Sequence, residues 1–399
     1  GFIESVETLV KPFLGQYFKL LSCTERYAKY YGHFLHDNFW FPTTCNNCSG
    51  FASGDRGGIS AAEAASYSLG KAADFNVVIL GDYTLTNTDV EGKLAVGGTF
   101  TANTFGVGSK LRGDHGDTLV VGGDINLSNG KVYGDAVYGG SATVTTDAGF
   151  EFRASDNTII RKSNLRRGTP IDFTSLGQSV KHLAANIAHK AAGLNYSQTV
   201  EPMAGGIATT IANATTNILY IQYDDDVTLA KFVGTNASEN VFNIETGALD
   251  TLKKLTFDVP ETAKVIINVE GESVDLSEFG IFFGDQDCNP GATNTVHFWC
   301  RDRSRNILFN FEQASTLSIS EVGFMGSILA PNAQVDFNNG HINGTLIADN
   351  LSGTGESHLH LFNSDTPAMP LSPSELPEPV TFLGLGLLGL GMVKLKRNT

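Results

Sequence analysis

Apolar and polar residues alternate in short segments along most of the chain. Between Asp74 and about Phe362, stretches of four to six β-branched and large apolar residues each end at Gly, Asn or Asp. Examples are FNVVILGDYTL, GKLAVGGTFTA, DTLVVGGDINLSNG and GSILAPNAQVDFNNG. This pattern indicates a strand followed by a turn. The dipeptides Asn129-Gly130 and Asn339-Gly340 are typical of turns in which the backbone takes a positive φ.

The spacing of these segments is close to regular. The segment GSILA at 326–330 recurs as GTLIA at 344–348, eighteen residues later. Paired glycines at 97–98, 122–123 and 139–140 return after 25 and then 17 residues. Repeats of about twenty residues, each with a strand, are typical of stacked coils. We therefore predict a mainly β fold, a right-handed parallel β-helix or solenoid. The alternative is a β-sandwich, whose turns also recur at short intervals.

One segment has the periodicity of a helix. Between about 174 and 192, apolar residues recur at steps of three and four on one face (Leu176, Val180, Leu183, Ile187 and Ala191). Asp172 or Thr174 can cap its start, and Gly193 can end it. We expect one amphipathic helix lying along the flank of the solenoid.

Composition limits the classes of function. The chain of 399 residues has 27 Lys and Arg against 42 Asp and Glu, a net charge of −15. This charge argues against nucleic acid as a partner. Glycine-rich segments such as GDAVYGGSA follow strands but open no helix, and the sequence contains neither a GK[ST] phosphate loop nor a GxSxG elbow. We predict no enzyme activity and no cofactor.

The body of the chain is similar to a known family. The segments DFNVVILGDYTLTNTDVEGKLAVGGTFTA, DTLVVGGDINLSNGKVYGDAVYGGSA and GSILAPNAQVDFNNGHINGTLIADNLSGTGESHLHLF, together with shorter ones between them, resemble the choice-of-anchor A family. These are bacterial adhesive domains whose relatives carry different C-terminal anchors. The resemblance covers about 74–363. It implies an adhesin-like or ice-binding-like β-solenoid, and it brings no catalytic residues.

The C-terminal residues have the order of an anchor. A Pro/Ser-rich tether at 366–376 precedes Pro377, Glu378 and Pro379, an apolar run at 380–393, and a basic end. The basic residues are Lys394, Lys396 and Arg397. Fourteen helical residues would span only about 21 Å, less than a bilayer core. We therefore expect a short sorting helix that anchors the chain in the membrane only transiently.

This tail resembles the PEP-CTERM sorting signal of exported proteins of Gram-negative bacteria. The resemblance implies recognition by an exosortase, cleavage near Pro377–Pro379, and delivery to the cell surface or extracellular matrix. The expected organisation is then a segment of unknown role at 1–60, an adhesive solenoid at 61–365, the tether at 366–376 and the sorting signal at 377–399. The first residues lack the basic start and compact apolar core of a secretory signal.

Cysteine and histidine residues suggest two local constraints. Export exposes the chain to an oxidising compartment, so Cys288 and Cys300, which flank a polar loop, are expected to form a disulfide. The other group offers the four ligands that a tetrahedral zinc needs: His33, His36, Cys45 and Cys48. Its spacing is short for a zinc finger, so we do not predict a metal site there. A disulfide or unstructured sequence is the alternative.

The sequence is compatible with three functions. The first is an exported adhesin that binds glycans or matrix polymers in attachment or biofilm. Its contacts would come from polar side chains at Thr84, Thr86, Thr99, Thr101, Asn126, Asn338 and Asn343. The second is ice binding, which needs a flat, regular row of threonines; the segments TLTNT, TFTANT and ATVTT do not show such a register by sequence. The third is a polysaccharide-acting enzyme, which needs carboxylates that converge in a groove.

Overall fold

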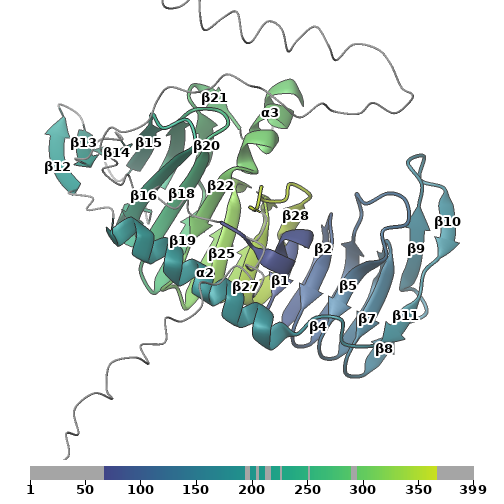
Figure 1. The fold of residues 1–399 in the computed structure, drawn as a ribbon. Helices are drawn as coiled ribbons and strands as arrows, with labels where there is room; N and C mark the ends of the chain where they lie inside the picture. The colour runs from purple at the N-terminus through teal and green to yellow at the C-terminus, as the bar shows by residue number, and fades with distance from the viewer. Residues whose placement is uncertain are drawn as a thin grey trace, which may run out of the picture. The chain divides into compact units, whose positions relative to one another are not determined.

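The computed structural model describes residues 67–193, 198–203, 206–211, 217–224, 227–249, 252–288 and 294–365. All of them belong to the second of two units, Ala64–Thr399. Parallel strands stack into a β-solenoid, as the spacing of the glycines and apolar segments predicted, and not into a sandwich. Each full coil contributes strands to three sheets (Figure 1).

The first sheet carries the long helix, and we name it the helix-side sheet. In spatial order its strands are β16 (Glu239–Glu245), β18 (Lys264–Glu270), β22 (Ile307–Asn310), β25 (Ser327–Asn338), β27 (Leu346–Gly353), β1 (Val77–Ile79), β3 (Leu94–Val96), β5 (Asp117–Val121), β7 (Asp135–Tyr138) and β11 (Leu165–Arg167). The N-terminal coils thus continue the stack beyond the C-terminal ones.

Within the described residues, the second sheet has exposed outward side chains, such as Thr84 and Thr101. It consists of β19 (Ser273–Ser277), β23 (Thr316–Ser320), the second halves of β25 and β27, β2 (Tyr83–Val90), β4 (Phe100–Val107), β6 (Ile125–Val132) and β8 (Ala142–Val144). The third sheet consists of β24 (Gly323–Met325), β26 (His341–Asn343), β28 (Glu356–His358), the ends of β2, β4 and β6, and β9 (Gly149–Arg153). Strand β10 (Ile159–Lys162) pairs with β9 in a hairpin.

A separate sheet of mixed direction includes strands from the middle of the chain. It contains β12 (Gln198–Met203), β13 (Gly206–Ile211), β14 (Asn217–Asp224), β15 (Val227–Gly234), β17 (Leu252–Asp258), β20 (Gly280–Phe283) and β21 (Gln286–Asp287). Strands β12 to β15 are antiparallel, and β15, β17 and β20 are parallel. The short helices are η1 (Gly70–Asp74) and η2 (Thr246–Ala248), and α3 spans Asn294–Ser304.

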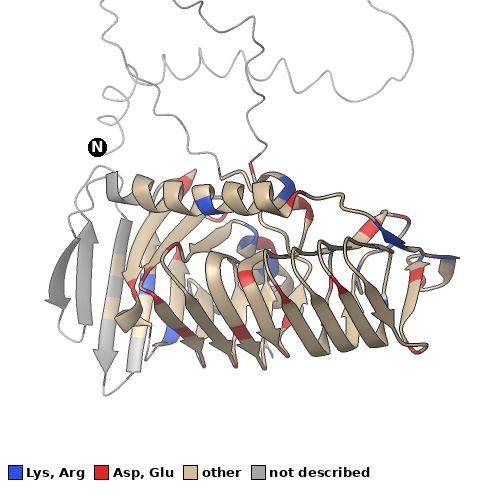
Figure 2. Ribbon diagram, turned by 90° about the horizontal axis from the view of Figure 1, so that it is seen from below, with Lys and Arg blue, Asp and Glu red and all other residues tan. Residues whose placement is uncertain are grey.

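The predicted amphipathic helix is α2 (Phe173–Gly193). Asp172 caps it, since its carboxylate accepts a hydrogen bond from the Ser175 N–H at 3.0 Å. Leu176, Val180 and Ile187 are buried against the helix-side sheet. Figures 1 and 2 show α2 running across the strands of that sheet. The helix therefore leads the chain back along the stack, which lets residues 239–358 build the coils that precede β1.

The glycine pairs occupy the corners between the first two sheets, where successive coils approach most closely. The N–H of Gly123 donates to the carbonyl of Gly98, and the N–H of Gly140 donates to that of Gly123. A Cβ atom at Gly122 would lie 2.4 Å from the carbonyl oxygen of Gly97. At the next corner Asn129 and Asn339 have φ values of 47° and 49°, as the turn dipeptides predicted. The glycine pairs and turn dipeptides therefore recur in the sequence because the corners that they form stack on one another in successive coils.

Candidate functional site: the polar face

Outward side chains of the second sheet form rows that run along the stack, and we name this surface the polar face. Its first row, in spatial order, is Asp275, Ser318, Asp336, Ser352, Thr84, Thr101, Asn126 and Thr143. Its second row contains Ser277, Ser320 and Asn338 on one side of the junction with β2, and Thr86, Asn103 and Ser128 on the other. The side chains in both rows are small, and none is basic.

The alternation within each strand creates these rows. Tyr83 and Leu85 point into the solenoid core and are 3% and 1% exposed. Because successive side chains of a strand point to opposite faces, Thr84 and Thr86 point outward. Neighbouring strands lie about 4.8 Å apart, and alternate residues of one strand lie about 6.7 Å apart. The polar face therefore presents hydroxyl, amide and carboxylate groups on a regular two-dimensional grid.

Hydrogen bonds between neighbouring side chains order parts of this surface. Asn129 Nδ2 donates to Thr104 Oγ1 at 3.0 Å, at the corner beside the rows. In the other half, Ser320 Oγ donates to Ser277 Oγ at 2.9 Å. Side chains held in this way lose little rotational freedom when a ligand binds.

Most of the residues expected to make polar contacts lie on this surface. Thr84, Thr86, Thr101, Asn126 and Asn338 belong to its two rows.

Two residues from the same expectation lie elsewhere. Thr99 stands just before β4, where its N–H donates to the Asp82 carboxylate at 2.7 Å. The expectation for Asn343 is wrong, because this side chain is fully buried and its Nδ2 donates to the Phe324 carbonyl at 3.2 Å. In β26 the adjacent Ile342 and Asn343 are both buried, and a buried amide needs partners within the protein.

In the structure Cys288 and Cys300 are joined by a disulfide, with Cα atoms 5.8 Å apart. The segment between them is not all loop, as the sequence had suggested, because α3 begins at Asn294 and includes Cys300. Arg303 lies over the rings of Phe283 and Trp299, which contact each other edge to face, and Trp299 Nε1 donates to the Glu261 carboxylate at 2.6 Å. The disulfide thus attaches α3 to the segment after β21.

Sequence reasoning missed a group of histidines beside α3. The rings of His341 and His358 are stacked with centroids 4.6 Å apart, and His297 of α3 lies edge-on to His341. Burial lowers the pKa of His341 to about 3, and the neighbouring His358 and Arg301 contribute to this shift. Burial also lowers the pKa of His360 to about 4. The rings of His341 and His360 are therefore neutral near pH 7, and strand pairing of distant segments brings His341 and His358 together.

Other expected sites lie outside the described residues. These are the zinc candidates His33, His36, Cys45 and Cys48, the Pro377–Glu378–Pro379 triplet, and the basic residues Lys394, Lys396 and Arg397. Within the described part of the chain, no three His, Cys, Asp or Glu side chains are arranged to hold a metal ion. No helix in that part is both long and apolar enough to cross a membrane.

Comparison with known proteins identifies the domain. Among curated proteins, none matches the chain significantly. Two solved structures are similar: an ice binding protein from an Antarctic biological consortium (12% identity, 75% of this chain, 91% of that chain, TM-score 0.26) and one from an Antarctic Flavobacteriaceae bacterium (11%, 74%, 79%, TM-score 0.23). The model of the family described as "Putative Ice-binding-like adhesive domain" matches residues 68–359. The chain therefore belongs to this family of ice-binding-like adhesive domains.

Proposed function

We propose that the protein is a non-catalytic exported adhesin whose polar face binds a repetitive, hydroxyl-rich surface such as a glycan or matrix polymer. The observation that carries this proposal is the register of the first row, from Asp275 to Thr143. A rigid grid of small donors and acceptors can form many weak contacts at once, with little entropy lost per contact. The family match supports the adhesive part of the proposal.

A bulky substitution in the middle of the row tests the role of the polar face. Thr101→Tyr places a large ring between Thr84 and Asn126, so it should separate a flat ligand from the grid. Thr262→Tyr is the matched control, because Thr262 is also exposed but lies in a turn outside the rows. We expect the full chain to bind its glycan on an array or the host matrix, and Thr101→Tyr alone to lose this binding. Equal binding by both variants would contradict the proposal.

Ice binding is the second candidate, and one observation favours it. Thr84 and Thr101 lie in register, with Asn126 and Thr143 following, so the threonines align across coils although the sequence does not show it. Half of the face, from Ser352 to Thr143, has no charge in its first row. Thermal hysteresis or inhibition of ice recrystallisation by the full chain, lost in Thr101→Tyr and kept in Thr262→Tyr, would select this function over glycan adhesion.

The proposed route to the surface uses the C-terminal tail. Residues 377–399 resemble a PEP-CTERM sorting signal, and the body resembles the choice-of-anchor A family, whose name implies an anchor downstream. An exosortase would then recognise the tail while the apolar run holds the chain transiently in the inner membrane. Fractionation of the host with intact chain and with a chain lacking 377–399 tests this route. The intact form should reach the surface or matrix, and equal distribution of both forms would remove the sorting claim.

A further inference from the structure

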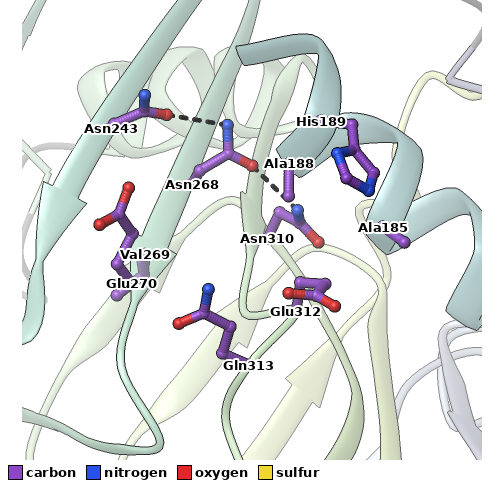
Figure 3. A pocket seen from close by; sticks show the side chains of 10 residues that line it. All are labelled: Ala185, Ala188, His189, Asn243, Asn268, Val269, Glu270, Asn310, Glu312 and Gln313. Atoms are coloured by element: carbon purple, nitrogen blue, oxygen red, sulfur yellow. Dashed lines mark hydrogen bonds between the residues drawn. The ribbon is translucent and has the colours of Figure 1, made fainter. Parts of the chain in front are cut away.

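A pocket under the C-terminal part of α2 has the features of a binding site. Its volume is about 370 Å³, and its lining comes from α2 and from three neighbouring strands and their ends (Figure 3). The lining residues are Ala185, Ala188, His189, Asn243, Asn268, Val269, Glu270, Asn310, Glu312 and Gln313. The helix presents small alanines here, whereas Leu176 and Val180 fill the corresponding space further along. The pocket lies on the helix-side sheet, a different sheet from the polar face.

One column of the helix-side sheet, meaning one in-register residue from each successive strand, changes from apolar to polar beside the pocket. From β7 to β25 the in-register residues of this column are all apolar: Val137, Val120, Ala95, Val78, Ile347 and Leu329. The next three positions of the same column are Asn310, Asn268 and Asn243. Three consecutive amides below a helix are less favourable than apolar residues, because each amide needs hydrogen-bond partners and an apolar side chain would need none.

The asparagines form a hydrogen-bonded ladder that leaves one acceptor unused. Asn268 Nδ2 donates to Asn243 Oδ1 at 3.0 Å (Figure 3). Asn310 Nδ2 donates to Asn268 Oδ1 at 2.9 Å and to the Ala184 carbonyl at 3.0 Å. The Oδ1 atom of Asn310 has no partner, although this residue is only 1% exposed. A buried acceptor without a donor is unfavourable, so a ligand that donates a hydrogen bond to it removes this cost.

The charge around this acceptor is negative. Glu270 and Glu312 line the pocket, and among the described residues neither carboxylate forms an ion pair. No Lys or Arg is among the residues that line it. The last turns of α2 add the partial negative charge of a helix C-terminus. Glu270 is exposed and Glu312 half-buried, unlike the apolar surroundings that a general acid needs, so the pair is suited to binding and not to glycoside cleavage.

From these features we propose that the pocket binds an organic ligand with a primary ammonium group. The ammonium would donate to Asn310 Oδ1 and lie close to the two carboxylates, and a charge-assisted hydrogen bond is stronger than a neutral one. The volume is at the lower end for ligand pockets and accommodates a small polar body. An amino sugar and a lysine side chain share this chemistry. The site is independent of the polar face.

Titration calorimetry of the full chain tests the proposal. The probes are glucosamine and Nα-acetyl-lysine amide, with N-acetylglucosamine and glucose as uncharged controls. We expect one-to-one binding of an ammonium probe, at least about tenfold tighter than its uncharged control. Tighter binding of glucosamine would identify an amino sugar as the ligand, and tighter binding of the lysine amide would identify a lysine side chain. The proposal would be overturned if glucosamine and N-acetylglucosamine bound equally, or if no probe showed saturable binding below about 50 mM. It would also be overturned if Mg²⁺ or Ca²⁺ competed at lower concentration than the probe.

Variants separate this site from general effects on the fold. Glu270→Gln and Glu312→Gln should each weaken ammonium binding about fivefold or more, since each removes one charge and keeps the shape. Ala188→Leu should block the pocket without a change in charge, and the melting temperature shows that the chain is folded. Glu321→Gln changes an exposed carboxylate outside the pocket and should bind normally. Thr101→Tyr should also bind normally. Unchanged binding in Glu312→Gln and Ala188→Leu would place the ligand elsewhere.

Discussion

Val78 pairs with Ile347 on adjacent parallel strands, although the two residues come from opposite ends of the domain. The coil of β27 and β28 thereby becomes the direct neighbour of the coil of β1 and β2. Asn76 connects the same two coils, because its Nδ2 donates to the carbonyls of Gly344 and His358, at 2.9 and 3.0 Å. Its Oδ1 accepts from the Gly92 N–H at 3.1 Å. One buried amide thus supplies three hydrogen bonds at the junction.

Substitution of this amide should destabilise the whole domain. Asn76→Ala removes three hydrogen bonds in a fully buried site, so we expect the free energy of unfolding to fall by about 2–4 kcal/mol. Urea denaturation followed by circular dichroism measures this loss. Asn103→Ala, an exposed control in β4, should change stability by less than about 0.5 kcal/mol. If Asn76→Ala lost no more stability than Asn103→Ala, the junction would not depend on Asn76.

The glycine corners should not accept a methyl group. Gly122→Ala would bring Cβ within 2.4 Å of the Gly97 carbonyl oxygen and 3.1 Å of the Phe173 ring, so coils or helix must shift. We expect destabilisation of about 1–3 kcal/mol in thermal or urea unfolding. Gly247→Ala is the control, because no atom lies within 4 Å of its added Cβ. Equal stability of both variants would argue against close stacking at the corner.

The bond between Cys288 and Cys300 should protect both sulfurs in the isolated protein. Peptide-level thiol labelling under denaturing, non-reducing conditions should leave both residues unmodified, and labelling of both would contradict the bond. Replacement of the pair by serines should lower stability by about 2–3 kcal/mol, since the closed loop is 12 residues long. The peptide-level readout is needed because the chain has 5 cysteines.

Acidification should weaken the fold through His341. Its pKa is about 3 in the folded state against about 6.5 for an unperturbed histidine, so the unfolded chain binds more protons between these values. Stability should therefore fall as pH decreases from about 6.5 toward 3. Asp89, whose pKa burial raises, acts in the opposite direction. His341→Gln should reduce the slope of stability against pH relative to the unsubstituted protein, and an unchanged slope would contradict this role.

The local repeats predicted much of the solenoid because they record direct stacking. The segments GSILA and GTLIA, eighteen residues apart, are in register, with Ile328 opposite Leu346 and Ala330 opposite Ala348. The helix was predictable for a similar reason, since its buried positions Leu176, Val180 and Ile187 follow one face. In both cases the signal lies within a short stretch of sequence.

Features that depend on distant pairing could not be predicted in this way. Nothing local in the sequence of β1 indicates that it pairs with β27, so the order of the coils was not visible. The same limit applies to the polar pocket, where Asn243, Asn268 and Asn310 become one column only after β16, β18 and β22 align. The expectation for Asn343 was wrong because the sequence alone did not show that Ile342 and Asn343, on opposite faces of β26, are both buried.

The two ends of the described domain meet at the same place. The N–H of Tyr67 donates to the Asp365 carboxylate at 2.7 Å, and that of Leu69 donates to Ser364 Oγ at 2.8 Å. Tension that enters through residue 365 is therefore delivered to the interior of the stack, beside the junction of β27 and β1, and not to a terminal coil. If the proposed C-terminal anchor and adhesive contact are correct, an attached surface would be pulled through coils on both sides of that point, and the load would be shared between them.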